Sequence, residues 1–172
     1  MRKIAGRHLW ATKIIDPQPK DLILEIGCGT GILAGELASH LQEGGFHGLD
    51  RSAPLLEKAK KRNHRHLKSG RMTLYNMEFL DFDPSLKFDK IVAFNVNFFQ
   101  RKAPRELEKI KTLLGVDGRL YVFFQAPYNV DMSHGDPILE NLLDQSFKVQ
   151  MVELMPQDPI SALGVIVKAP LQ

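Results

Sequence analysis

The sequence predicts an α/β fold in which a parallel sheet is covered by helices on both faces. Two observations predict it. Short apolar runs alternate with segments of helical periodicity along the chain, which is typical of strand–helix–strand units. The last two apolar runs are joined by about eight irregular residues, too few for a crossover helix, so we expect these two strands to form an antiparallel hairpin.

The composition is that of one globular domain. Of the 172 residues, 44% are hydrophobic and 25% are charged. No apolar run approaches the roughly 18 residues that a membrane-spanning helix needs. The single cysteine, Cys28, allows neither an internal disulfide nor a cysteine cluster for zinc, so we expect no metal site and a cytoplasmic location. The net charge of +3 permits an acidic partner without requiring one.

The first half of the chain predicts three strands and two helices. The apolar run Leu22–Ile26 is typical of a buried strand. The helix that follows has a leucine at every fourth position: Leu33, Leu37 and Leu41. Residues 46–50 form the second expected strand, Ser52 is placed to cap a helix over 53–63, and residues 72–77 form the third strand.

The second half continues the alternation. A fourth strand is expected over 90–96 and a fifth over 119–125. Between them, the apolar residues of a helix over 103–114 share one face, and Gly115 is expected to end this helix. The remaining elements are a helix and the two closing strands, expected around 137–145, near 147–153 and over Ala162–Lys168.

Three glycines at every second position follow the first strand: Gly27, Gly29 and Gly31. Glycine lets a backbone approach a ligand closely and supplies the positive φ of tight turns. A dinucleotide fingerprint would place its third glycine at position 32, which is Ile32, and no phosphate-loop Gly-Lys-Ser/Thr follows. A nucleotide-containing ligand other than NAD is therefore favoured over two alternatives, an NAD site and a tight turn without a ligand.

Two carboxylates refine this interpretation. Glu25 lies two positions before the first glycine, where it would repel a pyrophosphate but tolerate a ligand with an ammonium group. Asp50 ends the second strand, 19 residues after Gly31, where a carboxylate can accept hydrogen bonds from both hydroxyls of a ribose. Asp50 suits NAD and S-adenosylmethionine equally. Glu25 favours S-adenosylmethionine, whose methionyl end is cationic.

The motif "LEIGCGTG" with "GLDRS" about twenty residues later resembles the class I S-adenosylmethionine-dependent methyltransferases, and the resemblance runs from about Asp21 to Lys168. It implies a single Rossmann-like domain over 1–172 with a seven-stranded sheet in the order 3-2-1-4-5-7-6, only the last strand being antiparallel. It also implies S-adenosylmethionine as cofactor, S-adenosylhomocysteine as product, and a helical segment at 1–20 over the site.

The resemblance assigns the methionyl and ribose side of the cofactor to the glycine loop. Gly27, Cys28, Gly29 and Gly31 would line it. Glu25 would orient the loop or meet the methionyl ammonium through water.

The other cofactor contacts that the resemblance implies come from later strands. Asp50 would hold the ribose diol, with Arg51 beside the adenine ring. Asn76 and Met77 stand where the family often has Gly-Asp-Ala, and Asn76 can still accept from the adenine amino group through its amide oxygen. Asn95 would lie near the methionyl end.

Methyl transfer needs a positioned acceptor, exclusion of water and, for some acceptors, removal of a proton. The sequence has no dedicated catalytic motif, so the catalytic residues are unknown. The candidates are His8, whose unperturbed pKa lies near neutrality, and Tyr128, which follows the fifth strand; His134 is a more distant candidate. Residues 95–98 faintly resemble the Asn-Pro-Pro-Tyr/Phe loop of amino methyltransferases but lack both prolines.

Residues 58–71 contain seven Lys or Arg, two His and no acid. This stretch is a possible footprint for RNA or DNA phosphates, but no aromatic residue is interleaved for base stacking, which favours a solvated face. We therefore expect a small-molecule methyl acceptor and a possible homodimer. The alternatives are an RNA, DNA or protein methyltransferase that uses this stretch, and a cofactor-binding subunit without activity.

Overall fold

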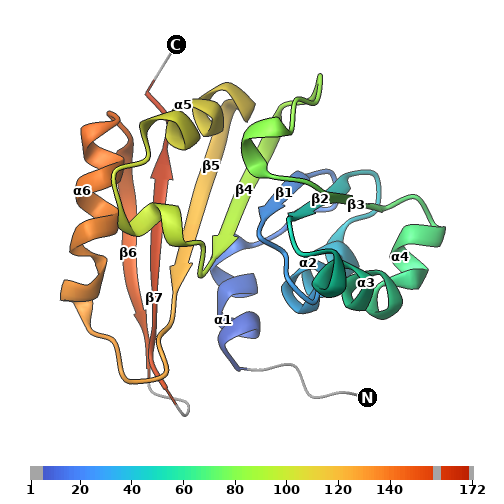
Figure 1. Cartoon of the computed structure of the whole chain (residues 1–172), viewed down its shortest axis with the longest axis horizontal. Helices are drawn as coiled ribbons and strands as arrows, with labels where there is room; N and C mark the ends of the chain where they lie inside the picture. Colours follow the sequence, from blue (N-terminus) through green and yellow to red (C-terminus); the bar gives the residue numbers. More distant parts are fainter. Residues whose placement is uncertain (1–5, 157–159, 171–172) are drawn as a thin grey trace. The chain divides into compact units, whose positions relative to one another are not determined.

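A computed structural model describes residues 6–156 and 160–170 (Figure 1). Its seven strands follow the order β3-β2-β1-β4-β5-β7-β6, which confirms the predicted α/β fold and strand order. The chain divides into two compact units, Met1–Pro84 and Ser85–Gln172. The single domain over 1–172 stays a prediction, and the two units are described in turn.

The first unit contains three parallel strands and four helices. Its strands are β1 (Leu22–Ile26), β2 (Gly45–Asp50) and β3 (Met72–Asn76), with β2 paired to both neighbours. The helices are α1 (Gly6–Ile15), α2 (Ile32–His40), α3 (Ala53–Arg62) and α4 (His64–Lys68), followed by a 3₁₀ turn at Phe79–Asp81. Because the strands are parallel, the glycine loop, Asp50 and Asn76 all follow at their carboxyl ends.

Most of the expected elements of this unit are present, with three differences. Ser52 occupies the N-cap position of α3, but its hydroxyl makes no capping hydrogen bond, because Pro54 removes one of the amide donors that it would use. The third strand ends at Asn76. The basic stretch forms a separate helix, α4, after Asn63 interrupts α3.

The N-terminal helix is present over Gly6–Ile15, and residues 1–5 lie outside the described part of the chain. It ends where Asp16 takes a positive φ of 47° immediately before Pro17, since proline disfavours helical backbone in the preceding residue. The helix packs against α2. Its expected position over the site stays a prediction.

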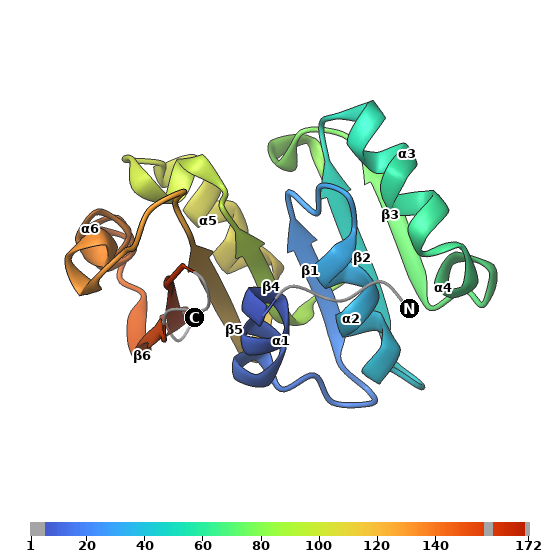
Figure 2. The same ribbon diagram turned by 90° about the horizontal axis from the view of Figure 1, so that it is seen from below.

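The described residues of the second unit form four strands and two helices. The strands are β4 (Phe88–Phe94), β5 (Leu114–Phe124), β6 (Lys148–Met155) and β7 (Ala162–Lys168). β4 and β5 are parallel, and β7 is antiparallel to both β5 and β6, which confirms the closing hairpin. The helices α5 (Pro104–Leu113) and α6 (Asp136–Asp144) lie on one face of these strands (Figures 1 and 2), and 3₁₀ turns occupy Asn97–Gln100 and Met132–Gly135.

α5 ends at Leu113, one residue before the expected end, and the strand that follows starts earlier than expected. Leu114 is already extended and pairs with Phe88, so β5 starts directly after the helix. The pairing then jumps to Lys90 opposite Arg119, which leaves the intervening residues of β5 as a bulge. At Gly118 a Cβ atom would lie 2.7 Å from the carbonyl oxygen of Phe88, so glycine is required by this close approach.

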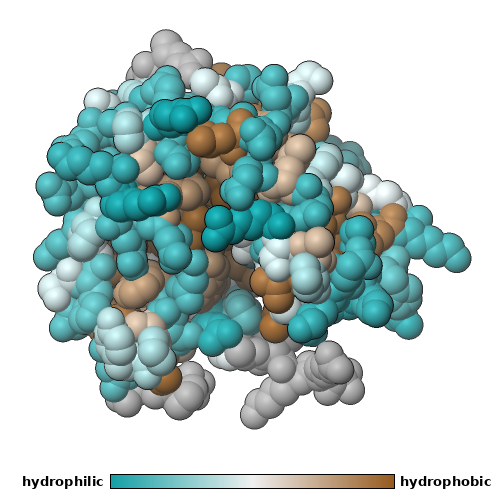
Figure 3. Space-filling view, viewed as in Figure 1, coloured by the Kyte–Doolittle hydropathy of each residue, from teal (hydrophilic) through white to brown (hydrophobic). Residues whose placement is uncertain are grey.

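Hydrophilic residues cover most of the face seen in Figure 3, with apolar residues in small separate groups. Among the described residues, no helix combines the length and the apolarity that crossing a membrane requires. The core of the second unit centres on β7, which is buried from Ala162 to Val167.

Candidate cofactor site and acceptor pocket

The three glycines after β1 adopt the left-handed backbone that their spacing predicts. Gly27, Gly29 and Gly31 have φ of 72°, 53° and 71°, a region that other residues adopt only with strain. The loop is tied to β2 because the Cys28 amide donates to the Leu49 carbonyl at 2.9 Å. A Cβ atom at Gly29 would meet no atom within 4 Å, so this side of the loop is open to a ligand.

The Asp50 carboxylate holds the same loop from the end of β2. One oxygen accepts from the Gly29 amide at 2.7 Å and the other from the Ser52 amide at 2.8 Å. A carboxylate oxygen has capacity for more than one hydrogen bond, so Asp50 retains acceptor positions for hydroxyl donors.

Glu25 is buried behind the loop. Its side chain belongs to a residue that is 3% exposed, and its Oε2 atom has no hydrogen-bond partner among the described residues. Burial, and secondarily the charge of Asp50, raise the pKa of Glu25 to about 8. A buried polar atom without a partner is unfavourable by about 1–3 kcal/mol, and a cationic donor from a ligand would remove this penalty.

The thiol of Cys28 is buried in the glycine loop. Burial is the main cause that raises the pKa of this thiol far above its usual range, and the charges of Glu25 and Asp50 add to it. A thiol that stays protonated is a poor nucleophile, so Cys28 contributes its backbone and its packing.

The end of α3 holds the far side of the glycine loop. Arg62 donates from Nε to the Thr30 carbonyl at 3.0 Å, and Asn63 donates from Nδ2 to the Gly31 carbonyl at 2.8 Å. Asn63 is 4% exposed. A Cβ atom at Gly31 or at Gly35 would lie 2.5 or 2.4 Å from its carboxamide, so Asn63 fits only because both positions are glycine.

We call these two residues, Arg62 and Asn63, the α3 clamp. The sequence interpretation missed it, since it treated Arg62 only as part of a basic run. Gly35 was the available signal, because glycine inside a helix usually marks a close approach of another group.

The rim of the site follows β2 and β3. Asn76 lies opposite Asp50 in the strand pairing and donates from Nδ2 to the Asp50 carbonyl at 2.9 Å, which leaves its amide oxygen as an acceptor. Arg51 is exposed and lies 3.7 Å from the carboxylate of Glu78. Met77 is half-buried beside them. The first unit thus gathers every predicted cofactor residue except Asn95 at the carboxyl ends of its strands.

Asn95 belongs to the second unit and takes a φ of 56° at the end of β4. Its carboxamide accepts from the Gln125 amide at 2.8 Å and donates to the Gln125 carbonyl at 3.0 Å. The side chain therefore joins the ends of β4 and β5, and its expected place near the methionyl end stays a prediction.

His8 is buried in α1, 8% exposed. Burial, with the charges of Arg7 and Arg62, lowers the pKa of His8 to about 4. Burial thus moves the pKa of His8 away from its unperturbed value, because the imidazolium form is disfavoured away from water. A histidine with this pKa is neutral at pH 7 and is a weak base.

A pocket of about 230 Å³ lies at the carboxyl ends of β4 and β5 within the second unit. The residues that follow the two strands form most of its wall, and Ile138 of α6 completes it. None of the lining residues carries a formal charge, and Tyr128 is the one with an ionisable side chain. Tyr128 is 57% exposed, so its hydroxyphenyl group stands at the mouth.

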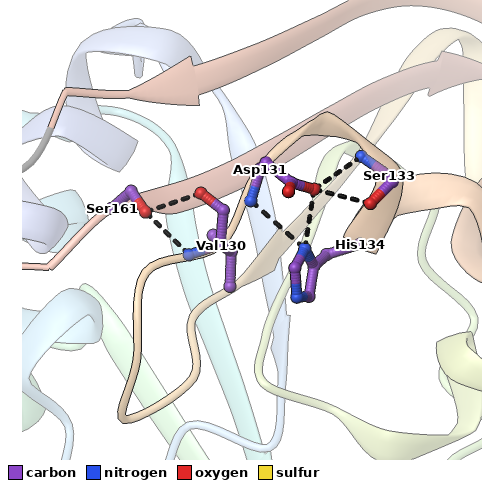
Figure 4. Close-up of polar contacts among 5 residues, drawn as sticks. All are labelled: Val130, Asp131, Ser133, His134 and Ser161. Carbon is purple, nitrogen blue, oxygen red and sulfur yellow. Dashed lines mark hydrogen bonds and ion pairs between the residues drawn. The ribbon is translucent and has the colours of Figure 1, made fainter.

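A polar cluster fixes the segment after Tyr128 (Figure 4). Asp131 accepts through Oδ1 from the Ser133 amide at 3.0 Å and from the Ser133 hydroxyl at 2.6 Å, and the same oxygen lies 2.9 Å from His134 Nδ1. These contacts lower the pKa of Asp131 to about 2. Ser161 anchors the cluster to the segment before β7. Its hydroxyl accepts from the Val130 amide at 2.8 Å and donates to the Val130 carbonyl at 2.7 Å.

His134, the more distant catalytic candidate, is thus part of a turn. Its ring centre lies 5.9 Å from that of Tyr128, in a tilted arrangement that supports the tyrosine. Asp131 and Ser133 were not predicted, since their contacts depend on the local turn geometry.

The basic stretch 58–71 is a solvated face of α3 and α4. Lys58, Lys61, Arg65 and Lys68 are exposed, and Lys60 pairs with Glu57 at 2.8 Å. Within the described ranges, no group of three or more His, Cys, Asp or Glu is placed to hold a metal ion.

Comparison with known proteins places this geometry in a family. A family model described as a methyltransferase domain matches residues 23–118, more than half of the chain. YrhH of Bacillus subtilis (strain 168), named as a methyltransferase, is 26% identical over 137 residues, which are 78% of this chain and 72% of YrhH. The tRNA1(Val) (adenine(37)-N6)-methyltransferase of Vibrio campbellii is 32% identical over 75 residues, 44% of this chain and 31% of that enzyme.

Among solved structures, the N-methyltransferase NodS of Bradyrhizobium japonicum WM9 in complex with S-adenosyl-L-homocysteine superposes with a TM-score of 0.74 at 16% identity. The match covers 95% of this chain and 86% of NodS, and it shows a shared fold. Together with the family model and the strand order, these matches show that the chain belongs to the class I S-adenosylmethionine-dependent methyltransferases of Rossmann-like fold.

Proposed function

We propose that this methyltransferase transfers a methyl group from S-adenosylmethionine to a small-molecule acceptor in the cytoplasm. The observation that carries the cofactor assignment is the arrangement at the end of β1. An open glycine loop lies between the Asp50 carboxylate and the buried carboxyl of Glu25, whose Oε2 has no partner among the described residues.

The chemistry of these donors and acceptors fits the cofactor. The Asp50 oxygens suit the ribose hydroxyls, the amide oxygen of Asn76 suits the adenine amino group, and Glu25 suits the methionyl ammonium, directly or through water. Gly27, Cys28, Gly29 and Gly31 would line the loop side, with Arg51 and Met77 beside the adenine and Asn95 near the methionyl end. NodS, which shares the fold, was solved with S-adenosyl-L-homocysteine.

S-adenosylmethionine, when bound, supplies a methyl group attached to a sulfonium sulfur. The positive charge on that sulfur already activates it as the leaving group. The chain therefore has to bind, orient and exclude water rather than activate the donor. The α3 clamp and Asp50 fix the loop before any ligand arrives, and Tyr128 is the ionisable group placed at the acceptor pocket. His8, with a pKa of about 4, remains the second candidate for proton removal.

Two features support a small acceptor. The pocket of about 230 Å³ has the volume of a molecule with one or two rings. Residues 95–98 faintly resemble an amino methyltransferase loop, but their side chains make contacts within the fold. Asn95 pairs with the Gln125 backbone, and Phe98 is buried. A homodimer remains a prediction from the sequence.

Calorimetry with S-adenosylhomocysteine tests the cofactor assignment. We expect binding to the parent chain and a dissociation constant at least tenfold larger for Asp50→Asn and Asp50→Ala, since the ribose loses its charged acceptor. Asp83→Ala, an exposed aspartate in the same unit, is the matched control and should bind like the parent. Absence of binding to the parent, or equal binding by the Asp50 variants, would contradict the proposal.

A second candidate function is methylation of RNA, which the 75-residue similarity to a tRNA methyltransferase favours. It would use the exposed basic face of α3 and α4. The third possibility, a cofactor-binding subunit without activity, is eliminated by turnover of any acceptor by the isolated chain with methyl-labelled cofactor.

A further inference from the structure

The pocket at the ends of β4 and β5 has more apolar than polar surface in its lining. Phe99 and Phe123 are among the lining residues, and each is 1% exposed. Each also packs against a second phenylalanine ring: Phe98 with centroids 4.4 Å apart, and Phe94 with centroids 5.6 Å apart. The aromatic walls are therefore held in place by their own neighbours.

The same pocket offers no charge to a ligand. Its lining contains neither Asp, Glu, Lys nor Arg. The nearest carboxylate along the chain beyond Tyr128 is that of Asp131, which is engaged by Ser133 and His134. A charged group that moves from water into such a site without a counter-ion loses hydration that the site does not replace, whereas a neutral aromatic ring gains from the transfer.

The lining also contains uncharged polar side chains. The carboxamides of Asn97 and Gln100 are exposed and have no hydrogen-bond partner in the described part of the chain. The Asn95 carboxamide is engaged by the Gln125 backbone. Asn97 and Gln100 can thus both donate to and accept from a hydroxyl or ring N–H at the edge of a ligand.

The volume sets the size of that ligand. A cavity of about 150 Å³ accommodates benzene, so about 230 Å³ suits one ring with substituents or two fused rings. We propose that this pocket binds an uncharged, planar aromatic acceptor of one or two rings, whose hydroxyl or N–H edge meets Asn97, Gln100 and Tyr128. This inference rests on the proposed function for its role as an acceptor site, but the binding itself does not require the cofactor.

A matched ligand series tests the proposal on the full chain. The probes are 2-naphthol, 2-naphthoate and 2-naphthylmethylamine at pH 7, which share the ring system and differ in charge. Titration followed by protein NMR is expected to give a dissociation constant for 2-naphthol at least tenfold smaller than for either charged probe. Equal or tighter binding of a charged probe would overturn the proposal.

Variants locate the binding. Ala126→Trp, which fills the pocket from a half-buried lining position, should abolish 2-naphthol binding, and Asn97→Ala with Gln100→Ala should weaken it several-fold. Met151→Ala, exposed on β6, is the control that should leave binding unchanged. Binding that survives Ala126→Trp in a folded protein would show that the ring binds elsewhere.

Two further arms separate the possible failures. Calorimetry with S-adenosylhomocysteine on the same samples reports on the proposed function alone. If the chain binds 2-naphthol but not S-adenosylhomocysteine, the pocket inference stands and the cofactor assignment fails. If it binds S-adenosylhomocysteine but not 2-naphthol, the cofactor assignment stands and the pocket inference fails. Displacement of 2-naphthol by single-stranded RNA at equal base concentration would overturn the small-molecule assignment and favour a nucleic-acid acceptor.

Discussion

At the scale of single residues, Glu25 contributes a strong pH dependence to the stability of the first unit. Its carboxyl is buried beside Asp50, and its pKa of about 8 compares with an ordinary value of 4.5. Between these two values the folded chain holds a proton that the unfolded chain has released. Raising the pH through this range therefore favours the unfolded state.

We predict that the Glu25 contribution to the free energy of unfolding, taken as the parent minus Glu25→Gln, falls as the pH rises from about 4.5 to about 8 and levels off above it. Between pH 5 and pH 9 this fall should be on the order of 4 kcal/mol. Urea unfolding at pH 5, 7 and 9 measures it. Glu140→Gln, exposed on α6, should follow the parent at every pH, and a Glu25→Gln profile as steep as the parent's would contradict the prediction.

At the scale of elements, the α3 clamp connects the end of a helix to the loop after β1. Arg62 and Asn63 bind successive carbonyls, those of Thr30 and Gly31. The two contacts differ in burial, since Arg62 is exposed and Asn63 is not. Removing each side chain should therefore have a different effect.

We predict that Asn63→Ala lowers the free energy of unfolding by about 1–3 kcal/mol, because it removes a buried hydrogen bond to the Gly31 carbonyl, which then accepts only from the Gly35 amide at 3.2 Å. Arg62→Ala should change the free energy of unfolding by no more than about 0.5 kcal/mol relative to the parent. It should nevertheless increase the rate of amide hydrogen exchange in residues 27–31 and weaken S-adenosylhomocysteine binding several-fold. Hydrogen exchange by mass spectrometry and calorimetry make the measurement. Lys61→Ala, the exposed neighbour, is the control; if it matches Arg62→Ala, the clamp has no specific effect on the loop.

The clamp also marks the limit of what local sequence predicts. The glycine spacing predicted the loop because a positive φ is a property of the residue itself. Asn63 lies 32 residues from Gly31, and a contact at that separation follows from helix packing rather than from any nearby pattern. The early start of β5 was missed for a similar reason, since pairing of Leu114 with Phe88 overrides the turn that Gly115 suggests.

At the scale of the whole molecule, the alternation of strands and helices and the grouping of residues at the strand ends could be predicted from periodicity and parallel pairing, whereas the strand order was implied by the family resemblance. The pocket at the ends of β4 and β5 could not, because most of its lining comes from the irregular segments that follow the two strands, whose shape depends on packing. The net charge of +3 and the exposed basic face likewise do not identify an acceptor.

The basic face gives a whole-molecule prediction. If the acceptor is small, RNA affinity should be weak and should not separate the parent from a variant with Lys58, Lys61 and Arg65 changed to Ala; Arg62 is left in place because it belongs to the clamp. Fluorescence anisotropy with a single-stranded RNA between 50 and 200 mM salt makes the measurement. Tight binding that falls steeply with salt in the parent and is lost in the triple variant would favour RNA methylation instead.

The position of β7 between β5 and β6 has a consequence for biosynthesis. β6 leaves the ribosome before the strand that attaches it to the sheet, while β1, β2 and β3 are all available much earlier. Until residues 162–168 emerge, β5 and β6 each present an open edge to other chains. The interval between the synthesis of β5 and that of β7 is therefore when a nascent chain is most exposed to aggregation and has most use for a chaperone.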